Sequence, residues 1–189
     1  MKTKNYLLAI ALILSGNILF AQEIKVNTEK SSIEWQGKKI GGKHEGFIQL
    51  KSGSFEWKKN KIVSGNFVVD MNSITNTDLK DEGTNQKLVG HLKSDDFFGV
   101  ETYPTASFEL IESTPFNNGK ATLTGNITIK DKTERISFEV VKSGNEYVAD
   151  VEIDRSKFDV RFGSKSFFNN LGDRAIDDIF TLKIKLVVS

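Results

Sequence analysis

Hydrophobic and polar residues alternate with a period of two along most of the chain after Gln22. The alternation is clearest over residues 121–129, 136–140 and 180–188. Because successive side chains of a β-strand point to opposite faces, these runs predict strands with one buried and one solvated face. Weaker runs of the same kind cover residues 33–35, 47–57, 67–71, 106–110 and 147–153. The pattern predicts about eight strands in all.

Short turn signals rich in Asn, Gly, Asp and Lys separate these runs. Connections of this length join antiparallel neighbours and leave no room for the crossover helices of a parallel sheet. Residues 44–57 and 173–188 are longer than ordinary strands, which favours a closed barrel over a sandwich. We therefore expect an all-β fold, an antiparallel barrel of about eight strands.

Two segments depart from the strand pattern. Apolar residues have helical spacing within residues 85–92, and residues 164–171 are a second candidate for a turn of helix. Two pairs of adjacent rings, Phe97–Phe98 and Phe167–Phe168, lie near these segments. We expect one or two short helices that cap or flank the barrel, with the ring pairs as lids over its ends.

Met1–Ala21 has the pattern of a secretory signal peptide, with two early lysines, the apolar run Leu7–Leu14 and a small residue before the expected cut. The apolar run is too short to span a membrane. We expect cleavage after Ala21, a periplasmic or secreted protein, and a single barrel domain over residues 22–189.

Composition and charge narrow the classes of function. The 26 Lys and Arg residues nearly balance the 25 Asp and Glu residues without forming blocks, which argues against a nucleic-acid partner. The absence of Cys excludes disulfides, thiolate nucleophiles and Cys-containing zinc sites. Two histidines are too few to complete a metal site, so we expect no metal. Export argues against ATP- or NAD-dependent catalysis, and we expect no cofactor.

Charged side chains concentrate after the predicted strand that ends near residue 153. Asp154 and Arg155 come first, followed by Arg161, Asp173 and Arg174. These groups could hold a ligand head group, or they could form an ion-pair network that closes one end of the barrel. The candidates for contact with a polar head group are His44, His91, Asp154 and Arg155.

The aromatic residues are strongly biased toward Phe, with 14 Phe against three Tyr and two Trp. Phe residues occur in most of the predicted strands, where glycines at positions 46, 53, 65 and 125 also occur. A glycine within a strand marks a bulge, a bend or a close approach to the backbone. A barrel of this size can be filled by its own side chains or can hold one elongated ligand.

Several blocks of sequence, in the same order, carry a resemblance to a known family. They are Gly42–Phe47, Asp70–Ile74, His91–Phe98, Tyr103–Phe108, Leu123–Lys130 and Ile153–Arg155. Over Lys25–Val188 the chain resembles the YceI-like family. The resemblance implies an eight-stranded, lipocalin-like antiparallel barrel that holds polyisoprenoid or fatty-acyl molecules in an apolar channel, without established catalysis. Asp131 replaces a Gly found in many members, in a turn that we expect outside the barrel.

We therefore expect an exported carrier or storage protein for a long apolar ligand such as a polyisoprenoid, an isoprenoid quinone or a fatty-acid derivative. The residues that strand alternation selects for the ligand-binding wall are Phe47, Phe67, Val69, Phe108, Leu123, Ile127, Phe138, Val151, Phe180 and Leu182. Two alternatives stay open: an enzyme acting on a lipid head group, and a structural or interaction domain with a filled core. Further candidate partners are a membrane, a donor or acceptor protein, and a second copy in a homodimer.

Overall fold

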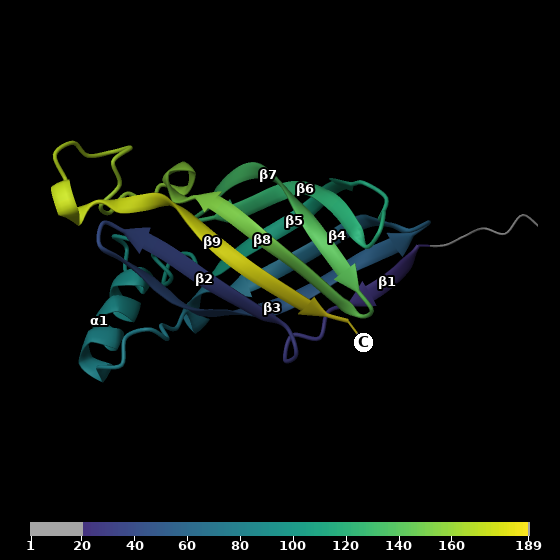
Figure 1. Ribbon diagram of the computed structural model, residues 1–189, viewed down its shortest axis with the longest axis horizontal. Helices are drawn as coiled ribbons and strands as arrows, with labels where there is room; N and C mark the ends of the chain where they lie inside the picture. The colour runs from purple at the N-terminus through teal and green to yellow at the C-terminus, as the bar shows by residue number, and fades with distance from the viewer. Residues whose placement is uncertain (1–20, 189) are drawn as a thin grey trace, which may run out of the picture.

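The computed structural model describes residues 21–188, in which nine strands form one antiparallel sheet that closes on itself (Figure 1). Residues 1–20 of the predicted signal peptide lie outside the described residues. The strands are β1 (Gln22–Lys25), β2 (Ser32–Lys39), β3 (Gly42–Lys58), β4 (Lys61–Asp70), β5 (Thr105–Ser113), β6 (Lys120–Ile129), β7 (Lys132–Ser143), β8 (Glu146–Asp154) and β9 (Ile176–Val187).

The nine strands occupy eight positions around a closed barrel. Their order is β3, β2, β9, β8, β7, β6, β5 and β4, and β4 pairs again with β3. β1 adds no further position, because it pairs with residues 54–57 of β3 on the edge where β2 pairs with residues 42–48. The prediction of an all-β, eight-stranded antiparallel barrel is confirmed.

Tight turns join several neighbouring strands. Lys59 and Asn60 between β3 and β4, and Lys130 and Asp131 between β6 and β7, all have positive φ, from 50° to 60°. Two-residue hairpin turns with positive φ at both positions match the right-handed twist of the strands they join. Asp adopts this conformation more readily than most residues, which explains how the turn accommodates Asp131.

Four short helices accompany the barrel: α1 (Glu82–Lys93) and the 3-10 helices η1 (Met71–Ser73), η2 (Arg155–Phe158) and η3 (Gly172–Arg174). The Asp81 side chain caps α1 by accepting a hydrogen bond from the Thr84 backbone N–H at 2.8 Å. In the candidate segment 164–171, a single turn forms, closed by a hydrogen bond from Phe168 N–H to Ser164 O, and it does not extend into a helix. Among residues 21–188, no helix is long and apolar enough to cross a membrane.

A bulge in β3 decides which of its side chains face the interior. The register between β3 and β4 shifts between Leu50 and Ser52. Counting back in twos from the buried Phe55 places Phe47 inside the barrel, but the extra residue reverses that assignment. Ile48 and Leu50 are buried instead, and Phe47 is 45% exposed. The assignment of Phe47 to the wall is therefore wrong.

Candidate ligand-binding cavity

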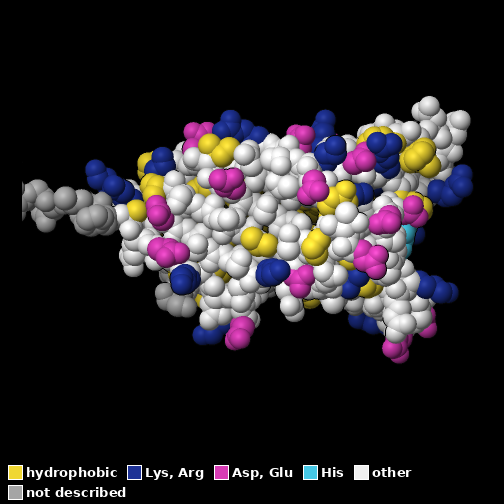
Figure 2. Space-filling model, turned by 180° about the vertical axis from the view of Figure 1, so that it is seen from behind, with side chains coloured by type: hydrophobic (Ala, Val, Ile, Leu, Met, Phe, Trp, Pro, Cys, Tyr) yellow, Lys and Arg dark blue, Asp and Glu magenta, His cyan; other side chains and the backbone are white. Residues whose placement is uncertain are grey.

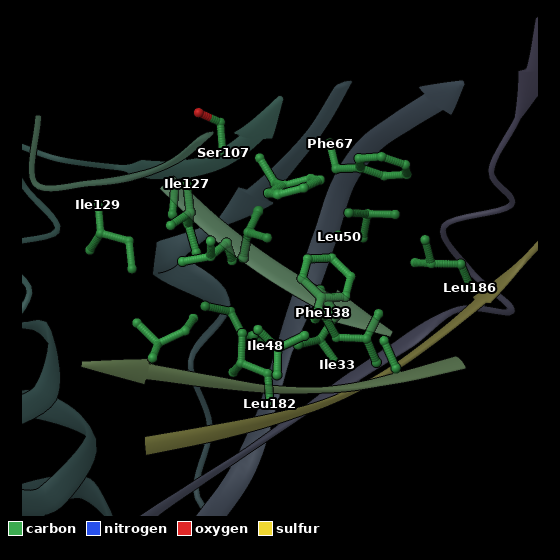
Figure 3. A pocket seen from close by; sticks show the side chains of 18 of the residues that line it. Ile33, Ile48, Leu50, Phe67, Ser107, Ile127, Ile129, Phe138, Leu182 and Leu186 are labelled. Atoms are coloured by element: carbon green, nitrogen blue, oxygen red, sulfur yellow. The ribbon is translucent and has the colours of Figure 1, made fainter. Parts of the chain in front are cut away.

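An apolar cavity lies inside the barrel, and all eight strands that form the barrel contribute to its wall (Figure 3). Its volume is about 160 Å³, measured as space open to the centre of a water molecule. One buried water needs only about 10–15 Å³ by this measure. The side chains therefore do not fill the barrel.

The sequence pattern identified most of the wall. Of the ten residues selected from strand alternation, all but Phe47 line the cavity. They are Phe67, Val69, Phe108, Leu123, Ile127, Phe138, Val151, Phe180 and Leu182. Their contact with a ligand stays a prediction.

Other parts of the wall were not predicted from the sequence. Ile184 and Leu186 continue the alternation of β9 beyond Leu182, so the same signal was present there. Met71 and Phe98 also line the cavity, but they lie outside the strands, where alternation gives no information.

The wall offers almost no polar chemistry. Among its lining residues, only Ser107 and Tyr147 carry a polar side-chain atom. In Figure 3 the Ser107 hydroxyl points away from the other labelled side chains. Burial raises the pKa of Tyr147 above its ordinary value of 10.0, so its phenol is neutral at physiological pH. A charged group in this cavity would lose its hydration without replacement, whereas each buried methylene gains about 0.8 kcal/mol.

Three Phe rings form a row along the wall. The ring centroids of Phe108 and Phe138 are 5.4 Å apart, and those of Phe67 and Phe108 are 6.3 Å apart. Gly125 makes room for the Phe108 ring, because a Cβ at this glycine would lie 2.4 Å from Phe108 Cζ. The Phe bias therefore includes a row of rings at the cavity surface.

Aromatic side chains close the end of the barrel where β7 turns into β8. Tyr147 contacts Phe55 edge to face with centroids 5.2 Å apart, and Phe116 lies 6.2 Å from Tyr147. Trp57 packs against Phe116 at 5.2 Å. Phe55 and Tyr147 are almost completely buried, so this cluster separates the cavity from solvent.

A second cluster closes the opposite end, where α1 and the 3-10 helices lie (Figure 1). Phe98 lines the cavity, and its ring lies 5.1 Å from Phe97 and 6.4 Å from Phe180. The prediction that Phe97–Phe98 forms a lid agrees with this arrangement. The same prediction for Phe167–Phe168 is wrong, because these rings are 39% and 48% exposed on the surface loop before η3.

Arg155 is buried at this second end and holds the surrounding loops together. Its guanidinium donates hydrogen bonds to the backbone carbonyls of Val160, Phe162, Ile176 and Asp177, at 2.8–3.1 Å. Its Nη2 also lies 3.4 Å from Asp178 Oδ1. Four of the five guanidinium N–H groups donate to these carbonyls, and the remaining one lies nearest to Asp178, whose buried Oδ1 accepts no hydrogen bond within residues 21–188.

Asp154 also has a local structural contact. Its carboxylate accepts hydrogen bonds from the Ser156 backbone N–H and hydroxyl, at 3.0 and 2.6 Å, and so caps η2. Within residues 21–188, no ion pair joins two members of the predicted network: Arg161 pairs instead with Asp159 at 2.6 Å, and Arg155 pairs with Asp178.

His44, on β3, is hydrogen-bonded to the segment that follows η1. Its Nδ1 lies 2.8 Å from Asp78 Oδ2, and the Glu45 backbone N–H donates to Asp78 Oδ1 at 2.9 Å. Burial alone would raise the pKa of Asp78, but the hydrogen bonds from Glu45, His44 and Asn76 outweigh burial and lower the pKa to about 2. These bonds hold residues 75–78 against β3.

This segment covers the interior face of β3. The Trp35 indole N–H donates to the Thr75 carbonyl at 3.0 Å, and the Thr75 backbone N–H donates to Phe47 O. Gly46 permits the contact, because a Cβ there would lie only 1.9 Å from Thr75 O. Asn76 and Ile74 are buried at the same place. The segment adds to the closure of the second end.

His91, on α1, has aromatic neighbours instead of polar ones. Its ring lies 4.3 Å from Phe162 and 5.7 Å from Phe97, edge to face in both cases. Within residues 21–188, no hydrogen bond or ion pair joins any two of the four predicted head-group residues. The same part of the chain contains no group of three or more His, Asp or Glu residues placed to hold a metal ion.

The outer surface carries mixed charge. On the face in Figure 2, basic and acidic side chains are interspersed with small apolar areas. This distribution agrees with the near balance of charges in the sequence and leaves the apolar cavity as the most distinctive feature of the molecule.

Comparison with known proteins identifies the family. The YceI-like domain matches residues 24–188, which is most of the chain. The chain belongs to the YceI-like family. A search of curated proteins gave no match.

Several solved structures share this fold. BcnA from Burkholderia cenocepacia is 25% identical with a TM-score of 0.64, over 87% of this chain and 99% of BcnA. A polyisoprenoid binding domain from Saccharophagus degradans, implicated in plant cell wall breakdown, is 13% identical with a TM-score of 0.59, over 88% of this chain and 97% of that domain. The YceI protein of Campylobacter jejuni is 18% identical with a TM-score of 0.52, over 99% of both chains. At 13% and 18% identity these two comparisons establish the fold.

Proposed function

We propose that this YceI-like protein binds one long apolar chain, such as a polyisoprenoid or a fatty-acyl chain, inside its barrel and acts as a carrier or store. The observation that carries the proposal is the unfilled cavity with a wall made almost entirely of hydrocarbon. The polyisoprenoid-binding description of the Saccharophagus domain, which has the same fold, supports the choice of ligand class.

The dimensions of the wall indicate how much of a chain fits inside. The lining residues of β9 extend from Phe180 to Leu186, which at about 3.4 Å per residue is about 20 Å along the strand. A strand tilt of about 40° reduces this to about 15 Å along the barrel axis. Each C–C bond of about 1.5 Å advances an extended hydrocarbon by about 1.25 Å, so about 12 carbons, or three isoprene units, fit in line.

Hydrophobic burial supplies enough free energy for binding without a polar recognition site. About 12 methylenes at about 0.8 kcal/mol each give a gross gain of about 10 kcal/mol, from which ordering of the chain and loss of its free motion subtract. The gain is spread over the whole wall. This accounts for a binding protein whose sequence shows no compact motif of polar residues.

Purification without detergent, followed by native mass spectrometry and organic extraction, tests the proposal. We expect one apolar molecule per barrel in the purified protein or, after delipidation, one-to-one uptake of the fluorescent fatty acid cis-parinaric acid. A barrel that is isolated empty and binds neither this probe nor a prenyl alcohol would contradict the proposal.

A matched pair of Phe variants assigns binding to the interior. Phe138→Ala removes a ring from the wall and is expected to weaken binding of cis-parinaric acid by about 1–2 kcal/mol through lost dispersion contacts. Phe168→Ala removes the same atoms from the surface, where the ring is 48% exposed, and is expected to leave binding unchanged. Equal effects of both substitutions would place the bound probe elsewhere.

Export is part of the proposed role, and the sequence of Met1–Ala21 supports it. Cell fractionation and mass spectrometry of the native protein are expected to show an exported chain that begins at Gln22. A chain that retains Met1 in the cytoplasm would contradict this part of the proposal. We favour binding over the enzyme alternative, because its candidate groups are not brought together: His44 pairs with Asp78, Arg155 bonds backbone carbonyls, and His91 lies among aromatic rings.

A further inference from the structure

The barrel wall is incomplete between β7 and β8. These strands pair only next to their shared turn, from Val141 with Val148 to Ser143 with Glu146. By contrast, β6 pairs with β7 from Lys120 to Ile129, and β8 pairs with β9 along all of β8. Figure 1 shows β7 and β8 together at the turn and diverging from it. We refer to the unpaired stretch between residues 132–140 of β7 and 149–154 of β8 as the β7–β8 gap.

Fixed structure bounds this gap at both ends. The turn at Gly144 and Asn145 joins the two strands at one end. At the other end, η2 follows β8 directly and contacts both β7 and β9. The Lys130 ammonium donates to the carbonyls of Phe97 and Asp159, at 3.0 and 3.4 Å, and ties the start of β7 to this region. The gap is therefore a defined interruption of the hydrogen-bonded wall and not a frayed edge.

Six cavity-lining side chains lie along the gap, and three of them are only partly buried. On β7, Ile136 and Phe138 line the cavity but are only partly buried, whereas Val140, next to the paired stretch, is 5% exposed. On β8, Ala149 is partly buried at the corresponding point, whereas Val151 and Ile153 are 4% and 2% exposed. A groove on the outer surface, which includes Glu139 and Asp150, shares Ala149 and, on β9, Ile184 with the inner cavity. The cavity and the outer surface thus approach each other here.

The two ends of the barrel offer a less direct route. Passage at one end requires displacement of the buried Phe55 and Tyr147 rings. Passage at the other end requires movement of Phe97 and of the loops that Arg155 holds by its backbone hydrogen bonds. Between β7 and β8, a chain can pass without breaking a strand ladder, because none exists beyond Val141 and Val148. Lost ladder bonds would leave buried polar groups unsatisfied, which is costly.

We propose that apolar ligands enter and leave the cavity sideways, between β7 and β8, with Ile136, Phe138 and Ala149 at the opening. This inference rests on the proposed function, since it describes the route to that same cavity. A chain with more carbons than the cavity accommodates can also leave its polar end in the opening, in contact with water.

A cross-link across the gap tests the route. Continuing the register from Val141 and Val148 places Glu139 opposite Asp150, and both lie on the outer surface. The chain has no native Cys, so the double variant Glu139→Cys/Asp150→Cys carries the only two thiols. A short bis-maleimide joins them, and mass spectrometry confirms the product. The control is Ser54→Cys/Asn66→Cys, joined in the same way across the paired strands β3 and β4 on the opposite side of the barrel.

Uptake and release of cis-parinaric acid are followed by stopped-flow fluorescence, with circular dichroism as the check on folding. We expect the cross-link across the gap to slow both uptake and release by about tenfold or more. A change of this size lies within the spread of association rates among related complexes. Protein loaded before cross-linking is expected to retain its ligand. The control cross-link is expected to leave both rates unchanged.

The outcomes separate the route from the function. Unchanged exchange in the cross-linked protein, with normal binding before cross-linking, would overturn the sideways route and leave the proposed function intact. Equal slowing in the control would also overturn it, because a general stiffening of the barrel would then explain the effect. Absence of probe binding before any cross-link would remove the proposed function and the route with it.

Discussion

Filling the cavity from one wall position tests its proposed use as a chain-binding channel. Ala106 on β5 lines the cavity beside Val69, its register partner on β4. Ala106→Leu adds three carbon atoms to a wall that encloses unfilled space. If the added atoms occupy the channel, the longest chain that fits loses about three of its roughly 12 methylenes, or about 2.4 kcal/mol.

The expected effect depends on chain length. A loss of about 2.4 kcal/mol weakens binding of dodecanoic acid by about 60-fold. Octanoic acid still fits in the shortened channel, so its affinity is expected to change little. Displacement of cis-parinaric acid, followed by fluorescence, gives both dissociation constants. Equal losses for the two acids, or no loss for either, would refute the assignment of this cavity as the binding channel.

A second Ala provides the control for stability. Ala121 on β6 is buried but does not line the cavity, so Ala121→Leu overfills a closed part of the core and is expected to destabilise the protein by about 1–3 kcal/mol. Ala106→Leu buries its new methyl groups in empty space and is expected to preserve or increase the free energy of unfolding. Urea unfolding measures both. Comparable destabilisation by the two variants would show that the site of Ala106 is already filled.

Three further predictions concern the closure of the second end. Arg155→Met leaves Asp178 and several carbonyls without their buried partner and is expected to cost about 3–5 kcal/mol in urea unfolding; the exposed control Arg161→Met should change stability by less than about 0.5 kcal/mol. Gly46→Ala should cost about 3 kcal/mol or more, because its Cβ collides with Thr75 O, whereas Gly42→Ala, with open space at the Cβ, should be near neutral; thermal unfolding distinguishes them. Because the pKa of Asp78 is lowered from 3.8 to about 2, its ionised form stabilises the fold above pH 3.8, and this stability is lost as the pH falls toward about 2. Asp78→Asn should therefore make the free energy of unfolding depend less on pH between pH 3.8 and about pH 2. An unchanged pH profile would contradict the role of its hydrogen bonds.

The local sequence identified several wall residues correctly. It did not show which residues of β3 face the cavity. Period-two alternation identified Phe67, Phe108 and Phe138 because no bulge reverses the facing of their side chains. The same count failed at Phe47, because the bulge after Leu50 changes the inward-facing parity of β3. A bulge depends on how one strand pairs with its neighbour, and a hydrophobic pattern along a single strand does not record it.

Buried polar groups show the same limit. The sequence placed Arg155 near one end of the barrel and left open whether it holds a ligand or closes that end. Its position is decided by carbonyls of residues 160, 162, 176 and 177, which reach it only when the following loop folds back. The exposure of Phe167 and Phe168 could not be predicted either. Both lie in a loop, where the alternation of hydrophobic and polar residues does not indicate which side chains are buried.

By itself, the sequence determined the strand content, the antiparallel hairpins, the barrel class and most of an apolar wall, because alternation and turn residues act over a few neighbouring positions. Only the tertiary structure decided that the interior is unfilled, that Arg155 and His44 have structural partners, and that β7 separates from β8. The cavity volume and the closure of the barrel depend on all eight strands together. The β7–β8 gap opens because the two strands diverge beyond Val141 and Val148, and that divergence exists only in the folded barrel.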